Sequence, residues 1–323
     1  MGRAAPSHRV RAGRRGVVEK TLRALTIGIA SWQNPNALDA AIHSVRRHSA
    51  TDWTLLVIDN ASPNPAVREV INRHSAEEPR VRAIMLDMNT GYVGAVNSLL
   101  SCAMTEYVAY LDNDVVIQTD AWDETLASYL DRFHEIGIIF PHGGAYPIPR
   151  GAYHEILWGV GSCWMVSRVA AEDARWINPV FDPGGLAVTD DAPFFDPTLG
   201  HHEEVDFQTR LRLAGYRIAS ARDVSVAHAG NASADPASQD RITRGVIRWV
   251  NKWCRYFYGS RVTYHSSNVL RHEDWPPSRL YLEEYWKLHL PGLNDAPETI
   301  THGGEYDLIR VPRLRGFYLG RIV

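Results

Sequence analysis

The chain has 323 residues, a length that suits two average domains or one large α/β domain. Hydrophobic residues make up 45% of it and charged residues 22%, which excludes a largely disordered chain. The formal net charge is −3, so no overall basic field points to nucleic acid. Three cysteines are too few for a disulfide framework, and no apolar run is long enough to cross a membrane. A reducing, cytoplasmic location is the simplest expectation.

The first 20 residues are basic and lack the apolar segment of a secretory signal. We expect residues 1–22 to form a flexible basic leader. The alternative is a weak contact with anionic lipid, which would place the protein peripherally at the inner face of a membrane. The basic residues are Arg3, Arg9, Arg11, Arg14, Arg15 and Lys20.

Short apolar runs alternate with segments of helical periodicity in the first third of the chain. Strands are predicted at 25–31, 53–58, 81–86 and 107–111, and helices at 36–49, 67–74 and 95–104. Strands that alternate with helices of this length predict a mainly parallel sheet with right-handed crossovers.

The second half of the chain is less regular. A strand is predicted at 158–166, a long loop at 178–200, a helix at 201–215, a strand at 217–228 and an amphipathic helix at 241–258. Residues 259–323 carry no pattern that assigns them.

Three polar clusters follow predicted strands: Ser31-Trp32-Gln33, Asp59-Asn60 and Asp112-Asn113-Asp114. Polar residues often end strands, but ligands of open α/β sheets bind beyond the carboxyl ends of the strands, so three such clusters favour a binding site. Asp112 and Asp114 can share a divalent cation and the diphosphate that it neutralises.

A second acidic cluster, His201-His202-Glu203-Glu204-Val205-Asp206, stands at the start of a predicted helix. The positive end of a helix dipole stabilises carboxylates there, which is a purely structural reading. Alternatively, one of these acids is a general base. His228 ends a predicted strand and is structural unless a metal lies close.

Six segments in this order resemble the inverting family-two nucleotide-sugar glycosyltransferases of the GT-A fold, bacterial rhamnosyl-, galactosyl- and galactofuranosyltransferases above all. The segments are TIGIASWQNP, VIDNAS, NTGYVGAVN, YLDNDV, GVGSCWMVSR and HEEVDFQTRLRLAGYRI, and they cover residues 25–230. The resemblance implies an α/β GT-A domain at 23–235, with a Rossmann-like, mainly parallel sheet flanked by helices. Its nucleotide-binding half would be 23–118 and its acceptor half 119–235, followed by a helical extension at 236–323.

The resemblance also implies roles for single residues. Trp32 replaces the tyrosine that usually stacks on the base, Asp59 accepts a hydrogen bond from the base N3–H, and Glu204 is the general base. The family more often has Asp at the position of Glu204, so Glu203 is a possible substitute. The donor-binding residues that the resemblance implies are Ala30, Ser31, Trp32, Asp59, Asn89, Gly91, Gly94, Asp112, Asn113 and Asp114. The implied ligands of Mn²⁺ or Mg²⁺ are Asp114, Asp112 and His228. The implied acceptor-binding residues are Glu203 and Trp164.

The expected activity is transfer of a sugar, with inversion, from a UDP- or dTDP-sugar to a hydroxyl of a glycan, a glycolipid or a protein. A sugar-phosphate nucleotidyltransferase is an alternative, although no Gly-rich loop with a basic residue follows the first strand. An inactive sugar-nucleotide-binding module is another, although Asp112, Asp114 and Glu204 are all present.

Overall fold

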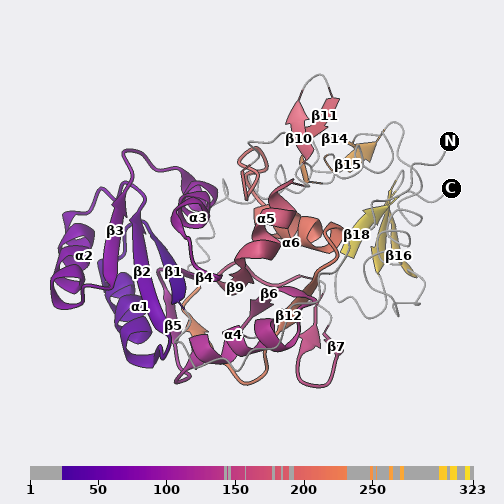
Figure 1. The fold of residues 1–323 in the computed structure, drawn as a ribbon. Coiled ribbons are helices and arrows are strands. Elements are labelled where there is room, and N and C mark those ends of the chain that lie inside the picture. The colour runs from indigo at the N-terminus through magenta and orange to yellow at the C-terminus, as the bar shows by residue number, and fades with distance from the viewer. Residues whose placement is uncertain are drawn as a thin grey trace.

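The computed structural model describes one continuous body and several separate stretches of the C-terminal region (Figure 1). The leader expected at 1–22 lies outside the described residues. The described residues are 24–141, 144, 147–156, 158–176, 179–182, 185–188, 193–230, 248, 249, 252, 262–264, 270–272, 298–303, 306–310 and 317–320.

A nine-stranded sheet with the order β3-β2-β1-β4-β9-β6-β12-β8-β7 forms the centre of the protein. Its first four strands confirm the predicted parallel strands to within one or two residues at each end. They are β1 (Ala24–Ser31), β2 (Asp52–Asp59), β3 (Val81–Met85) and β4 (Tyr107–Asp112).

The same sheet continues through the second half of the domain. Strand β9 (Cys163–Ser167) runs antiparallel to both β4 and β6 (Ile136–Phe140). Strand β12 (Arg217–Ser220) is parallel to β6, and β8 (His154–Glu155) and β7 (Ile148–Pro149) complete the edge with antiparallel pairs. The expected nucleotide and acceptor halves therefore share one sheet, which is mainly but not wholly parallel.

Helices cover both faces of this sheet, in three layers (Figure 1). One apolar core joins α1 (Pro35–His48), α2 (Pro65–Glu77) and α4 (Trp122–Arg132) to one face. The other core joins α3 (Gly91–Cys102), α5 (Arg168–Trp176) and α6 (Glu203–Leu213) to the opposite face. This arrangement of the sheet and helices confirms the predicted α/β fold.

Helix starts follow local side-chain chemistry. Helices α1 and α2 each begin with proline after an asparagine whose side chain accepts a backbone N–H, Asn34 from Ala37 and Asn64 from Ala66. Helix α3 begins at Gly91 rather than at the predicted residue 95. The prediction was wrong because Gly91–Gly94, the last four residues of the expected turn, form the first turn of the helix instead.

The predicted strand at 217–228 is in fact two strands. It breaks at 221–225, and β13 (Val226–His228) pairs antiparallel with β5 (Val115–Ile117) in a separate small sheet. The loop predicted at 178–200 contains a short hairpin of β10 (Pro179–Asp182) and β11 (Gly185–Val188). Long-range pairing, which local pattern does not encode, decides both differences.

The C-terminal region differs from the expected helical extension. Residues 248, 249 and 252 have helical backbone, and the rest of the helix predicted at 241–258 lies outside the described residues. The later described stretches are strands, so a wholly helical extension was wrong; the β-branched run Thr299-Ile300-Thr301 and the following glycines favour a hairpin there. These strands are β14 (Val262–Tyr264), β15 (Leu270–His272), β16 (Glu298–Gly303), β17 (Tyr306–Arg310) and β18 (Phe317–Gly320).

Within the ranges given above, no helix combines the length and the apolar character that a membrane crossing requires.

Candidate active site

The three predicted polar clusters meet at the carboxyl edge of the sheet. In the parallel register Ser31 lies opposite Asp59, and Ala30 lies opposite Asp112. The Asn60 amide donates to the Ser31 carbonyl over 2.8 Å, which ties the first two strand ends together. Asn113 Nδ2 donates to the Gln33 carbonyl over 3.3 Å and ties the third cluster to the first. This edge is where ligands of open α/β sheets bind.

One end of this edge offers a flat apolar surface beside a buried carboxylate. The Trp32 side chain is 50% exposed, although large aromatic side chains are usually buried. Asp59 is buried, and its Oδ1 accepts the Ser62 amide over 3.1 Å. The Ser31 hydroxyl is also buried and has no hydrogen-bond partner among the described residues. A planar base with hydrogen-bonding edges matches these features.

The loop before α3 is held against the same edge by Asn60. Its Oδ1 accepts the Thr90 amide over 2.8 Å and its Nδ2 donates to the Gly91 carbonyl over 2.9 Å. Asn89 Oδ1 accepts the Gly91 amide over 2.8 Å. A Cβ on Gly94 would stand 2.1 Å from Thr90 Oγ1, so this turn requires glycine there. Asn60 therefore positions the loop residue Asn89 and the first turn of α3, which carries Gly91 and Gly94.

Asp112, Asp114 and His228 gather beside the strand ends. Pairing of β13 with β5 places His228 opposite Val115, and His228 Nε2 lies 3.1 Å from Asp114 Oδ1 and 3.9 Å from Asp112 Oδ2. One ligand atom from each of the three residues lies within 4.8 Å of the others. Two carboxylate oxygens and one imidazole nitrogen form a donor set that fits Mn²⁺ or Mg²⁺.

Tyr110 orients the first of these carboxylates. Its hydroxyl is buried on the same strand and donates to Asp112 Oδ1 over 2.7 Å, so Oδ2 is the oxygen turned toward His228. Burial raises the pKa of Asp112 to about 6; the hydrogen bond from Tyr110 opposes this rise and the charge of Asp114 adds to it. A cation between the carboxylates would relieve their mutual repulsion.

Glu204 lies in the first turn of α6, beside Gly161. A Cβ on Gly161 would lie 3.5 Å from Glu204 Cγ and 3.1 Å from the Tyr92 hydroxyl, so these two side chains flank Gly161. The next residue, Ser162, accepts the Asp112 amide at its carbonyl over 2.8 Å. Burial raises the pKa of Glu204, and the charge of Glu204 contributes to the raised pKa of Asp112.

Glu203 occupies a different environment from its neighbour. It is 9% exposed, and burial raises its pKa to about 7, with further increases from the charges of Glu204, Asp206 and Asp196. Asp206 is fully buried and paired with Arg210 and Lys252, which leaves it no route to a substrate. Of these acids, Asp206 is held in the interior by its two cations, whereas Glu204 lies beside Gly161.

Trp164 does not fit the acceptor-binding role expected for it. Its side chain is 1% exposed and stacks on Tyr110, with ring centroids 5.4 Å apart, and on Phe195. Its Nε1 donates to the Tyr92 hydroxyl over 3.4 Å. Strand β9 lies in the middle of the sheet, so Trp164 forms part of the core below the site.

Sequence reasoning missed several residues that hold the site together. Tyr110 stands two positions before Asp112 and hence on the same face of β4, a spacing that could have revealed it. Tyr92, Asp196 and Lys252 carried no local signal, because their partners are distant in sequence.

Part of the chain is similar to a known family and to several known proteins. Residues 26–175 match Glycosyl transferase family 2. A stretch of 102 residues is 26% identical to the putative teichuronic acid biosynthesis glycosyltransferase TuaG of Bacillus subtilis, covering 32% of this chain and 40% of that protein. A stretch of 98 residues is 30% identical to the succinoglycan biosynthesis protein ExoO of Rhizobium meliloti, covering 30% and 27%. The matches therefore span less than half the length of these relatives.

Solved structures agree on the fold. The mannosyltransferase PcManGT from Pyrobaculum calidifontis, in complex with GDP-Man and Mn²⁺, aligns with a TM-score of 0.55 and 15% identity over 83% of this chain and 70% of its own. GalNAc-T7 with UDP, GalNAc and Mn²⁺ aligns with a TM-score of 0.54 and 13% identity over 84% and 55%. At this level of identity the likeness confirms the GT-A fold alone.

Proposed function

We propose that the protein is a divalent-metal-dependent, inverting glycosyltransferase that uses a nucleoside-diphosphate sugar. The observation that carries this proposal is the convergence, at one sheet edge, of three elements of such a site. They are an exposed aromatic ring beside a buried carboxylate, the Asp112, Asp114 and His228 cluster, and Glu204. The match to Glycosyl transferase family 2 supports the same class of reaction.

The donor is a UDP- or dTDP-sugar. Trp32 stacks on the pyrimidine, and Asp59 accepts a hydrogen bond from N3–H, a donor that uracil and thymine have and cytosine lacks. Ala30 and Ser31 line the base end, while Asn89, Gly91, Gly94 and Asn113 lie along the path toward the diphosphate. The structural relatives were solved with GDP-Man and with UDP, so both bind a nucleoside diphosphate group, which supports a nucleotide-sugar donor here.

Asp112, Asp114 and His228 would hold the metal, as their donor set allows. A bound Mn²⁺ or Mg²⁺ supplies positive charge next to the diphosphate, which stabilises the negative charge of the leaving group. Tyr110 keeps Asp112 in the orientation that this requires. Both structural relatives contain Mn²⁺.

Glu204 acts as the general base. It removes the proton from an acceptor hydroxyl while that oxygen bonds to the anomeric carbon, and the bond from this carbon to the diphosphate oxygen breaks on the opposite face. A single displacement inverts the configuration. The raised pKa makes Glu204 a stronger base than an ordinary carboxylate. The proposed acceptor is a hydroxyl of a glycan, a glycolipid or a protein, and the names of the curated relatives favour polysaccharide biosynthesis.

A nucleotide-sugar screen tests this proposal. Thermal unfolding is followed with UDP-, dTDP-, GDP- and CDP-sugars, each with and without Mn²⁺, because a ligand that binds the folded state raises the melting temperature. The donor that stabilises most is then supplied with candidate glycan acceptors, and the configuration of the product is read by NMR. A product that retains the donor's anomeric configuration contradicts the mechanism. Binding without any transfer or hydrolysis indicates an inactive binding module instead.

A further inference from the structure

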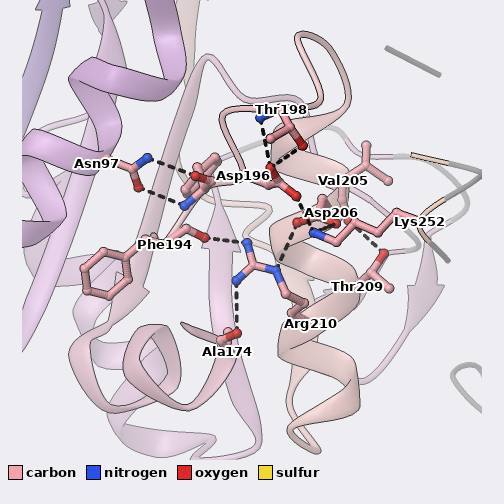
Figure 2. A network of polar contacts seen from close by, with 11 residues as sticks. Asn97, Ala174, Phe194, Asp196, Thr198, Val205, Asp206, Thr209, Arg210 and Lys252 are labelled. Carbon is pink, nitrogen blue, oxygen red and sulfur yellow. Dashed lines mark hydrogen bonds and ion pairs between the residues drawn. The ribbon is translucent and has the colours of Figure 1, made fainter. Parts of the chain in front are cut away.

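A fully buried ion-pair network lies behind the first turn of α6 (Figure 2). Lys252 Nζ donates to Asp196 Oδ2 over 2.8 Å and lies 2.9 Å from Asp206 Oδ1. Asp206 Oδ2 accepts Arg210 Nε over 3.0 Å. Lys252, Asp206 and Arg210 are all 0% exposed. Two positive and two negative formal charges thus balance inside the protein.

The network joins five separate parts of the fold: α3, α5, α6, the loop that holds Asp196 and the segment that holds Lys252. Arg210 donates from α6 to the carbonyls of Ala174 at the end of α5 and of Phe194. The side chain of Asn97 on α3 pairs with both backbone groups of Phe195, over 2.8 and 2.9 Å, directly before Asp196. Figure 2 shows Arg210 between these two carbonyls and Asp206, and Lys252 beside Asp196 and Asp206.

Asp206 belongs to the same helical turn as the acids of the site. Its amide donates to the His202 carbonyl over 2.8 Å, the first backbone hydrogen bond of α6, and Glu203 and Glu204 lie between them. Arg210 contacts one oxygen of Asp206 and Lys252 the other. The conformation of this turn is therefore set from both sides, by α6 itself and by Lys252.

Lys252 lies outside the residues 26–175 that match the family. Two neighbouring residues, Arg248 and Trp249, contact the same part of the fold. Arg248, four residues earlier, donates to the Thr198 carbonyl over 3.0 Å. The rings of Trp249 and His202 lie 5.9 Å apart between centroids. All three contacts reach the loop and turn that lead into Glu203.

We propose that Lys252 is a positioning residue, which holds the first turn of α6 so that Glu204 faces the reacting hydroxyl. This inference rests on the proposed function of Glu204. Without Lys252, Asp206 Oδ1 loses the cation that links it to Asp196 and to the segment of Arg248 and Trp249, and a buried carboxylate that loses its cation is strongly destabilised in its position. The start of α6 then moves relative to Gly161 and Asp112, which face Glu204 from the other side of the site.

The first test is Lys252→Met in the full chain, which keeps the length of the side chain and removes its charge. We expect kcat for transfer to fall about 10–100-fold, the range that a misplacement of about 1 Å produces, while the dissociation constant for UDP with Mn²⁺ stays within about twofold. Arg217→Met is the matched control. Glu155 is a buried carboxylate that contacts two arginines, Arg150 and Arg217, each over 2.8 Å, at the far edge of the sheet. Losing one of its cations should leave kcat unchanged.

Two double variants separate positioning from stability. Asp196→Asn combined with Lys252→Met leaves Asp206 and Arg210 as one negative and one positive buried charge, so the protein is expected to fold. Its kcat is expected to stay low, because Asp206 still lacks its contact with Lys252. On a Glu204→Gln background, Lys252→Met should cost far less than in the wild type, because the base that Lys252 positions is already absent. Recovery of kcat in the first double variant, or an equal loss on both backgrounds, would overturn the inference.

Hydrogen exchange makes the test independent of the proposed function. If the wild type transfers no sugar, the proposed function fails, and amide exchange of residues 203–213 is compared between Lys252→Met and Arg217→Met. Faster exchange confined to the start of α6 in Lys252→Met supports positioning by Lys252. Unchanged exchange there overturns it.

Discussion

Glu203 makes the stability of this protein depend on pH in a direction opposite to that of most carboxylates. Its pKa is raised from 4.5 to about 7, first by burial and then by the charges of Glu204, Asp206 and Asp196. The folded state therefore favours protonated Glu203, whereas the unfolded chain releases the proton near 4.5. The stabilisation from this group is complete below the unfolded pKa, falls as the pH rises, and is lost once the pH passes the folded pKa.

The two pKa values determine the size of the effect. One pKa unit corresponds to about 1.4 kcal/mol, so the whole shift is worth about 3 kcal/mol, of which about 2–3 kcal/mol is lost between pH 5 and pH 8. Glu203→Gln keeps the shape of a protonated Glu203 and cannot lose a proton. Its free energy of unfolding should therefore exceed that of the wild type at pH 8 by about 2–3 kcal/mol more than it does at pH 5.

The measurement is urea unfolding of both proteins at the two pH values, followed by circular dichroism. Glu69→Gln, at an exposed position of α2, is the control for loss of a carboxylate as such, and it should show no comparable change with pH. A difference between Glu203→Gln and the wild type that is the same at pH 5 and pH 8 would refute the reasoning. It would mean that Glu203 is not held protonated in the folded protein.

The remaining predictions concern the proposed chemistry. Glu204→Gln should reduce the rate of transfer about 10²–10⁴-fold with little change in donor affinity. The wild-type rate should rise with pH as Glu204 ionises at its raised pKa. A larger loss of transfer in Glu203→Gln than in Glu204→Gln would mean that Glu203 is the base. Asp114→Ala should abolish the gain in UDP affinity that Mn²⁺ produces, as measured by calorimetry, and a gain equal to that of the wild type contradicts this ligand assignment. Wild-type protein should bind UDP and dTDP more tightly than CDP and GDP, with the preference over CDP lost in Asp59→Asn. Trp32→Ala should weaken all pyrimidine nucleotides by about 1–3 kcal/mol, the usual value of one base stacked on an aromatic ring, and equal affinities before and after the change argue against stacking.

The sequence alone determined the parts of this protein that local physics specifies. Apolar runs of strand length between helical patterns predicted the four parallel strands, because burial on both faces leaves such a run few other structures. Parallel pairing then brings the strand ends to one edge, so the convergence of Ser31, Asp59 and Asp112 could be predicted from order along the chain. The acidic start of α6 was equally visible, since carboxylates there interact favourably with the helix dipole.

Only the tertiary structure decided which distant residues meet. The chain breaks after β12, and β13 then pairs with β5, which brings His228 to Asp114. Strand β9 lies in the middle of the sheet, which places Trp164 in the core rather than in contact with an acceptor. The different surroundings of Glu203 and Glu204, which are adjacent in sequence, also arise from packing. Lys252 shows the reason most clearly: its charge is stabilised in the interior by Asp196 and Asp206, which lie within 3 Å of it. An interaction of that kind depends on the positions of atoms from separate segments, and no local pattern of residues encodes them.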